Sequence, residues 1–347
     1  MKRPARLPVI AAVCMCALAC ASASGADSIQ VSETDEQIKI ETHELEAVIR
    51  KQGYVSGVAG GSFLDKQTGF RDAGFGLDIV DWIIESGSDE SYRDKLPREM
   101  VYEFNNSYHG RIAKRLVEGP QICTQARQLS PAVIRGKDFV AVQMDYKYHQ
   151  APPGKQAGSV WRQTLVFPAG KRYFLSCDKI TSANDGQASC LRLDMPGHIK
   201  HAGGDTFNEI YLSYHPDLLP ASEFQSDFAP DEKFRYVRSD KEPPKRFIRA
   251  YHLRDPQTGK SGPWLAGMTL DPAIVADAWC HQRGYVCMIE EFGGRPIRAG
   301  ESFSAAFVVG YFDTIDEMHA VYDQYAGSSG LEVSEGGWKF VREAKRE

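Results

Sequence analysis

The stretch of sequence that decides the fold is residues 140–148, which read VAVQMDYKY. Valine, methionine and tyrosine occupy every second position, and small or polar residues stand between them. Because successive side chains of a β-strand point to opposite faces, this period of two predicts a strand with one face in a core. Residues 191–195, LRLDM, repeat the pattern.

Further strand signals recur along the chain, and Gly, Pro, Asn and Asp separate most of them. The apolar or β-branched runs cover residues 38–42, 45–49, 161–167, 173–180, 209–214, 247–253, 264–270, 285–290 and 303–312. One helix is predicted near the end of the chain, where Thr314 and Glu317 form a capping box and Gly327 follows the last apolar position. The sequence therefore predicts an all-β fold: a large antiparallel β-sandwich, of the supersandwich or jelly-roll type, with one C-terminal helix.

The N-terminus predicts export. Three basic residues among the first six precede an apolar run at residues 7–18 and an A-x-A pattern at residues 21–23. We therefore expect a signal peptide at residues 1–25, followed by a single catalytic or binding β-sandwich domain at residues 26–347. The apolar run is shorter than the roughly 20 residues that span a bilayer, and a buried N-terminal helix is the alternative.

The residues Ala17-Leu18-Ala19-Cys20 resemble a bacterial lipobox, although Ala stands where Leu is usual three positions before the cysteine. A lipid anchor at Cys20 is thus one expectation, and free periplasmic or secreted protein is the other. No later segment is apolar enough to cross a membrane.

The net charge of the chain argues against some classes of binding partner. Without the predicted signal the chain has 38 basic and 46 acidic residues, a net charge of −8. Such a chain is a poor match for nucleic acid or anionic lipid. It can still bind an acidic sugar, since a local group of Arg, Lys or His side chains suffices for a carboxylate.

Five cysteines follow the predicted signal. Cys177 and Cys190 flank the turn-like segment 182–186, and Cys280 and Cys287 flank Gly284, so hairpins with disulfides between these partners are one hypothesis. Cys123 would then be the fifth cysteine, outside both predicted disulfides. The spacings match no structural zinc template.

Residues 38–42 (IKIET), 45–49 (LEAVI), 53–57 (GYVSG) and 65–69 (DKQTG) resemble the first hairpin of the galactose-mutarotase-like supersandwich. That fold also underlies several polysaccharide lyases and sugar epimerases. The whole chain looks like secreted proteins of bacterial polysaccharide-degradation systems, among them lyases and dehydratases of uronic-acid oligosaccharides such as those of ulvan. The resemblance implies a carbohydrate-active enzyme.

The chain carries no P-loop, dinucleotide fingerprint, G-x-S-x-G elbow or H-E-x-x-H motif, but it has three polar clusters. The first spans residues 105–121. β-Elimination on a uronate needs a base for the C5 proton, an acid for the leaving oxygen, and cationic or amide donors on the carboxylate. Tyr108 and His109 are candidates for the base and acid, and Asn105, Arg111 and Arg115 for substrate binding; a solvated polar loop is the alternative.

The second cluster is residues 279–285, WCHQRGY. His281 and Tyr285 would complete the catalytic pocket, Arg283 would clamp a carboxylate, and the aromatic rings would form a sugar platform. The alternative is a hairpin with exposed polar side chains. Glu290 and Glu291 follow, but adjacent strand residues face opposite ways, so by themselves they are not a paired-carboxylate site.

The third cluster contains His198, His201 and Asp205, which are candidates for a divalent metal. His198 is alternatively a substrate contact, or the cluster is purely structural. We expect that the protein needs no cofactor, and a bound divalent metal is the alternative.

Together these features predict a secreted enzyme that cleaves or dehydrates uronic-acid glycans by β-elimination, with an acidic polysaccharide or oligosaccharide as partner. The alternatives are a non-catalytic glycan-binding protein, or a glycoside hydrolase or epimerase on the same fold.

Overall fold

We analysed a computed structural model of the chain. It describes residues 29–53, 55, 57–72, 74, 79–85, 101–102, 112–113, 116–118, 128–151, 154–201, 205–229, 232–239, 242–282 and 284–342. The predicted signal peptide, Cys20 and Cys123 lie outside the described residues. Within these residues, no helix has the length and apolar character that crossing a membrane requires.

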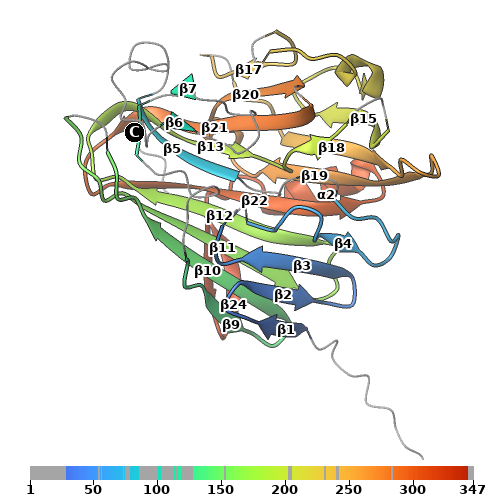
Figure 1. Ribbon diagram of the computed structural model, residues 1–347, viewed down its shortest axis with the longest axis horizontal. Helices are drawn as coiled ribbons and strands as arrows, with labels where there is room; N and C mark the ends of the chain where they lie inside the picture. The colour runs from blue at the N-terminus through green and yellow to red at the C-terminus, as the bar shows by residue number, and fades with distance from the viewer. Residues whose placement is uncertain are drawn as a thin grey trace, which may run out of the picture.

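Three antiparallel sheets form the body of the molecule (Figure 1). The four-stranded sheet has the order β1 (Gln30–Glu33), β2 (Gln37–Glu41), β3 (Leu45–Arg50), β4 (Leu64–Asp65). The nine-stranded sheet has the order β16 (Leu219–Pro220), β15 (Phe207–Leu212), β18 (Phe247–Arg254), β19 (Ser261–Thr269), β22 (Ser302–Phe312), β12 (Tyr173–Thr181), β11 (Val160–Pro168), β10 (Phe139–Lys147), β9 (Ala132–Arg135). The seven-stranded sheet has the order β17 (Tyr236–Val237), β20 (Val275–Gln282), β21 (Tyr285–Ile297), β13 (Gly186–Asp194), β5 (Ile79–Glu85), β8 (Leu116–Val117), and β14 (Ile199–Lys200) also pairs with β21.

The smaller elements complete the fold. They are the helix α2 (Ile315–Tyr325), the hairpin β23 (Gly330–Ser334) and β24 (Gly337–Val341), the pair β6 (Val101–Tyr102) and β7 (Ile112–Ala113), and the 3-10 turns η3 (Ala221–Phe224) and η4 (Pro272–Ile274). The predicted all-β sandwich with one C-terminal helix is confirmed for the described residues.

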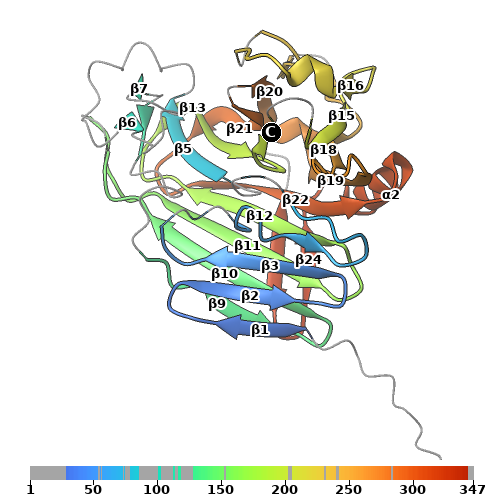
Figure 2. The same cartoon turned by 45° about the vertical axis from the view of Figure 1, so that its right-hand side comes forward.

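The nine-stranded sheet is covered on both faces. One face forms the main core with the four-stranded and seven-stranded sheets, through residues such as Ile40, Leu193 and Phe307. The other face forms a second core under α2 and the β23–β24 hairpin, with Val308 and Met318 among its members. Figure 2 shows the blue four-stranded sheet on one side of β9–β12 and β24 on the other. This double covering explains why β12, β19 and β22 are buried at most positions.

Residues 140–147 lie in β10, and their alternating side chains point to opposite faces of the sheet, as predicted. Val142 and Met144 lie in the main core, whereas Asp145 and Lys147 are exposed. The helix begins as predicted: Thr314 accepts the Glu317 backbone N–H at 3.1 Å, and the Glu317 carboxylate accepts the Asp313 N–H at 2.8 Å.

The predicted pairing of Cys177 with Cys190 is wrong, because no disulfide joins these two residues. Residues 182–185 do not close a hairpin; they carry the chain from β12 in the nine-stranded sheet to β13 in the seven-stranded sheet. Cys177 consequently faces the second core, and Cys190 lies in the other sheet.

The predicted pairing of Cys280 with Cys287 is also wrong. Gly284 does close the hairpin between β20 and β21, but Cys280 lies opposite Met288, and Cys287 lies opposite His281. Adjacent positions of a strand point to opposite faces, so Cys280 enters the main core while Cys287 points the other way.

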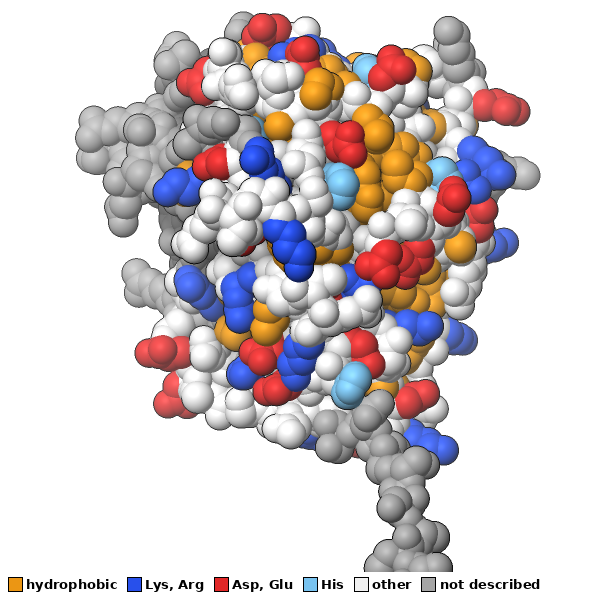
Figure 3. All heavy atoms as spheres, turned by 90° about the vertical axis from the view of Figure 1, so that its right-hand side faces the viewer, with side chains coloured by type: hydrophobic (Ala, Val, Ile, Leu, Met, Phe, Trp, Pro, Cys, Tyr) orange, Lys and Arg blue, Asp and Glu red, His pale blue; other side chains and the backbone are white. Residues whose placement is uncertain are grey.

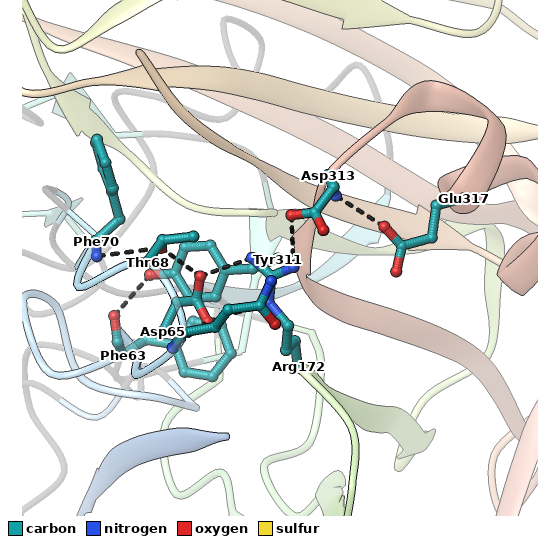
Figure 4. A network of polar contacts seen from close by, with 9 residues as sticks. Phe63, Asp65, Thr68, Phe70, Arg172, Tyr311, Asp313 and Glu317 are labelled. Carbon is teal, nitrogen blue, oxygen red and sulfur yellow. Dashed lines mark hydrogen bonds and ion pairs between the residues drawn. The ribbon is translucent and has the colours of Figure 1, made fainter. Parts of the chain in front are cut away.

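A buried ion pair joins the four-stranded sheet to the nine-stranded sheet (Figure 4). Arg172 precedes β12 and donates from Nε to Asp65 Oδ1 at 3.1 Å and from Nη2 to Asp65 Oδ2 at 2.7 Å. Its Nη1 donates to Asp313 at 2.6 Å, just before α2. Beside the pair, the Tyr311 hydroxyl donates to the Phe63 carbonyl at 2.6 Å.

We predict that Asp65→Asn lowers the free energy of unfolding by about 3–5 kcal/mol, because it removes the buried carboxylate of the pair and leaves the guanidinium of Arg172 with the exposed Asp313 alone. The matched control is Asp145→Asn, which breaks the pair with Arg162 on the exposed side of β10 and β11 (2.6 Å; the side chains are 52% and 54% exposed). That change should cost about 0–1 kcal/mol. Urea unfolding of the three proteins measures both values, and equal losses in the two variants would contradict the assigned importance of the buried pair.

Candidate functional site

One face of the seven-stranded sheet is polar, and the opposite face belongs to the main core. On β13, Leu191 and Leu193 point into the core, so Arg192 and Asp194 point to the other side. The register of β5, β20 and β21 adds the remaining members of what we call the polar face. Its chemically active or aromatic side chains are Asp81, Arg192, Asp194, Asp277, Trp279, His281, Tyr285, Cys287 and Glu291.

A charged row crosses the polar face from strand to strand. Arg192 lies opposite Asp81 on one side and Glu291 on the other, and Glu291 lies opposite Asp277. Arg192 donates to Glu291 Oε1 from Nε at 3.0 Å and from Nη2 at 2.9 Å. Arg235 holds both carboxylate oxygens of Asp277, at 3.1 and 2.6 Å. The row thus has three carboxylates and two guanidinium groups.

The ring of Trp279, which we call the aromatic wall, lies next to the charged row. The Arg192 guanidinium lies over the Trp279 ring, 5.4 Å from its centroid, and Trp279 is 6% exposed. The indole Nε1 is buried and makes no hydrogen bond within the described part of the structure. An aromatic ring next to buried charges is suited to the apolar face and polar edge of a sugar.

At the other end of the polar face, three different donor atoms gather. Asp194, His198 and Cys287 offer ligand atoms that all lie within 4.8 Å of one another, and each residue is buried. His198 Nε2 lies against Asp194 Oδ2, and Asp194 Oδ1 accepts the Met288 backbone N–H at 3.2 Å. We call these three residues the donor trio.

Local structure explains how His198 reaches the trio. After β13 the chain turns through residues 195–197 and pairs Ile199 with Val286, which brings His198 beside Cys287. The Tyr251 hydroxyl is 3.2 Å from both the Gly197 and Val286 carbonyl oxygens and so ties the turn to β21. Gly74 packs so closely that a Cβ there would lie 1.9 Å from the His198 carbonyl oxygen.

The structure brings together three of the described residues that the sequence singled out. His281 lies directly opposite Cys287, and Tyr285 lies two residues before it on the same face of β21. His198 joins them through the donor trio. The other predicted residues, Asn105, Tyr108, His109, Arg111, Arg115 and Arg283, lie outside the described residues.

The predicted grouping of His198 with His201 and Asp205 does not form. His201 stacks on Phe207 with ring centroids 4.0 Å apart, and its Nδ1 lies 3.0 Å from Thr206 Oγ1 and 3.5 Å from Asp205 Oδ1. His198 instead meets Asp194. Two histidines three positions apart share a side only on a helix, and this segment runs through a short strand.

The expectation that Glu290 and Glu291 face opposite ways is confirmed. Glu290 is fully buried on the core side, where Arg249 lies 3.2 Å away and the Thr269 hydroxyl donates at 2.6 Å. Burial raises the pKa of Glu290. Glu291 belongs to the polar face.

Sequence reasoning missed Arg192 and Asp194. Their signal was present in LRLDM, where two charges alternate with core residues on a strand that is not at an edge. A charge at such a position is rarely exposed to bulk water, so it marks either an ion pair or a site.

A separate pocket of about 310 Å³ lies between the turn after β4 and the β18–β19 turn. Both turns lie at the right-hand edge of Figure 1. Arg71, Arg254 and Lys260 supply cations to it, beside Asp255 and the ring of Phe70. Figure 3 shows this side of the molecule, where acidic and basic side chains are interspersed. The pocket therefore offers a local cationic lining on a surface of mixed charge.

No protein-family model matches the chain, and no curated protein matches it in sequence. Solved structures that resemble it include a galactose 1-epimerase from Lactobacillus acidophilus NCFM (8% identity, 82% of this chain and 98% of that chain, TM-score 0.43). An alpha-mannosidase from Enterococcus faecalis V583 is 10% identical over 92% of this chain and 33% of that chain, with a TM-score of 0.49. A heparan sulfate lyase from Pedobacter heparinus is 9% identical over 90% of this chain and 42% of that chain, with a TM-score of 0.38.

We predict a pH-dependent contribution from His201. Burial lowers the pKa of His201 below its ordinary value of 6.5, so the folded protein favours the neutral ring. A depressed pKa means that this stability is present above pH 6.5 and is lost as the pH falls through the folded-state pKa. The stability advantage of the wild type over His201→Gln should therefore shrink from about pH 7.5 to about pH 5 in urea unfolding. A difference that stays constant or grows on acidification would contradict the assignment.

Proposed function

We propose that the chain is an exported carbohydrate-active enzyme that moves protons on a sugar ring bound at the polar face. The observation that carries the proposal is the arrangement of that face: an aromatic wall at Trp279, a charged row on one side of it, and His281 with Tyr285 on the other. Export rests on the signal predicted at residues 1–25.

The spacing of the polar face supports a single sugar ring between two sets of acid–base groups. Cys287, which lies beside His281, and Glu291 are four positions apart on β21, and strands rise about 3.3 Å per residue, so their rows are roughly 13 Å apart. Ile289 and Trp279 occupy the row between them. A pyranose bound over Trp279 would therefore lie between the two rows.

Epimerisation at the anomeric carbon is the reaction that the described residues favour. A base takes the proton of the anomeric hydroxyl, the bond from the anomeric carbon to the ring oxygen breaks, and an acid protonates that oxygen; reclosure on the other face reverses the transfers. We assign the base to Glu291, whose Oε1 accepts hydrogen bonds from the Arg192 guanidinium. His281 is assigned as the acid.

The charge balance of the charged row supports a neutral sugar in this part of the face. Glu291 and Asp277 already hold the guanidinium groups of Arg192 and Arg235. A uronate carboxylate bound there would have to compete with these carboxylates, whereas a hydroxyl or hemiacetal would not.

β-Elimination on a uronate is the second candidate, and the cationic pocket favours it. Arg71, Arg254 and Lys260 could bind the acidic group of an oligosaccharide, and His281 and Tyr285 are suitable as base and acid. Neutralisation of the reacting carboxylate by Arg111, Arg115 or Arg283, and proton transfer by Tyr108 or His109, stay predictions.

The test is to incubate the purified chain with freshly dissolved aldoses and with uronic-acid oligosaccharides. Polarimetry follows anomer interconversion, and ultraviolet absorbance follows unsaturated products. We expect accelerated interconversion, and a loss of about 10²–10⁴-fold in kcat for Glu291→Gln with sugar binding retained, because a general base contributes about that factor.

The control variant is Glu209→Gln, which changes a glutamate paired with His252 at 3.0 Å on the nine-stranded sheet and should keep full activity. Unsaturated products without interconversion would select the second candidate. Binding without turnover on either set of sugars would overturn the enzyme proposal and indicate a glycan-binding protein.

A further inference from the structure

The donor trio combines three kinds of ligand atom that rarely meet in a protein interior. Asp194 is 4% exposed, Cys287 5% and His198 8%, and they come from β13, β21 and the turn between β13 and β14. A carboxylate, an imidazole and a thiol are all side chains that can bind a metal ion.

The sheet positions the trio around one point. Asp194 lies opposite Ile289, so Cys287 is its diagonal neighbour on the same face of β21. His198 arrives from the other direction because Ile199 pairs with Val286. The pairing of the backbone strands therefore places the three side chains next to one another.

We propose that Asp194, His198 and Cys287 bind a divalent cation of the zinc class. Thiolate and imidazole ligands select zinc and its neighbours, whereas magnesium and calcium take oxygen ligands. With bonds of about 2.0–2.3 Å, a tetrahedral ion needs donors roughly 3.3–3.8 Å apart, and the donors here lie within 4.8 Å of one another.

The contact between His198 and Asp194 sets two of the three donor atoms side by side. His198 Nε2 and Asp194 Oδ2 face each other, and the Cys287 Sγ lies near both. A divalent cation bound there would displace the Cys287 thiol proton to solvent. Asp194 Oδ1 meanwhile keeps its hydrogen bond from the Met288 N–H, which fixes the orientation of the carboxylate.

Three protein ligands are the number found in catalytic zinc sites, where water or substrate takes the fourth position. The trio shares the polar face with His281 and Tyr285, so the fourth ligand would be water or a sugar oxygen. Metal binding itself is independent of the proposed reaction, and a metal measurement can succeed where every sugar assay fails.

The experiment is to strip the purified full chain with a chelator, add one equivalent of Zn²⁺ or Co²⁺, and measure bound metal by mass spectrometry after gel filtration. We expect about one ion per chain, a rise in thermal midpoint on adding Zn²⁺, and a thiolate-to-cobalt charge-transfer band. Cys287→Ser should abolish the band, and both Cys287→Ser and His198→Gln should weaken binding by at least about 10-fold, since even residues around metal ligands contribute that much.

The chain offers two matched controls. Cys280→Ala removes a buried thiol that faces the main core from the neighbouring strand, and His201→Gln removes the histidine that stacks on Phe207. Both variants should bind metal like the wild type. Because Asp194 also supports the backbone of β21, Cys287→Ser and His198→Gln decide the test, with folding checked by circular dichroism. Absence of bound metal in the wild type, or an unchanged cobalt band in Cys287→Ser, would overturn the site.

Discussion

The ion pair between Asp65 and Arg172 fixes the four-stranded sheet on the nine-stranded sheet, and the polar face depends on that placement. Both partners are largely buried, and an unpaired buried charge costs several kcal/mol. A displacement of β4 from β12 would therefore separate the buried Asp65 carboxylate from its guanidinium and leave Arg172 with the exposed Asp313 alone. The chain that follows β4 continues to Asp72, which accepts the N–H groups of Gly61 and Phe63 at 2.7 Å each. Gly74 comes next and packs on the backbone of His198, so the same anchor limits where the donor trio can lie.

Local rules account for the part of the fold that the sequence predicted. The period of two at residues 140–148 placed Val142 and Met144 in the core, since alternation needs no knowledge of the partner strand. The capping box at Thr314 is equally local and begins α2 at the predicted place. The same rule correctly separated Glu290 from Glu291.

Long-range pairing explains what the sequence did not predict. The turn-like segment 182–186 signals a change of direction, but not whether the next strand joins the same sheet, and Cys177 and Cys190 ended in different sheets. The donor trio needs Asp194 and Cys287 on neighbouring strands that are far apart in sequence. The sequence could group His281 with Tyr285 because the two residues lie on one hairpin, where the register follows from the turn.

β21 contributes to the core and to the polar face at the same time, so its register must be fixed. A slip of one residue would turn Met288 and Glu290 to the polar face and Cys287 and Glu291 into the main core. The pair of Glu290 with Arg249, at 3.2 Å in the core, opposes that slip because a displaced Arg249 would lose its only carboxylate partner among the described residues. The buried pair of Glu290 and Arg249 thus fixes the register of β21, and with it the positions of Cys287 and Glu291 on the polar face.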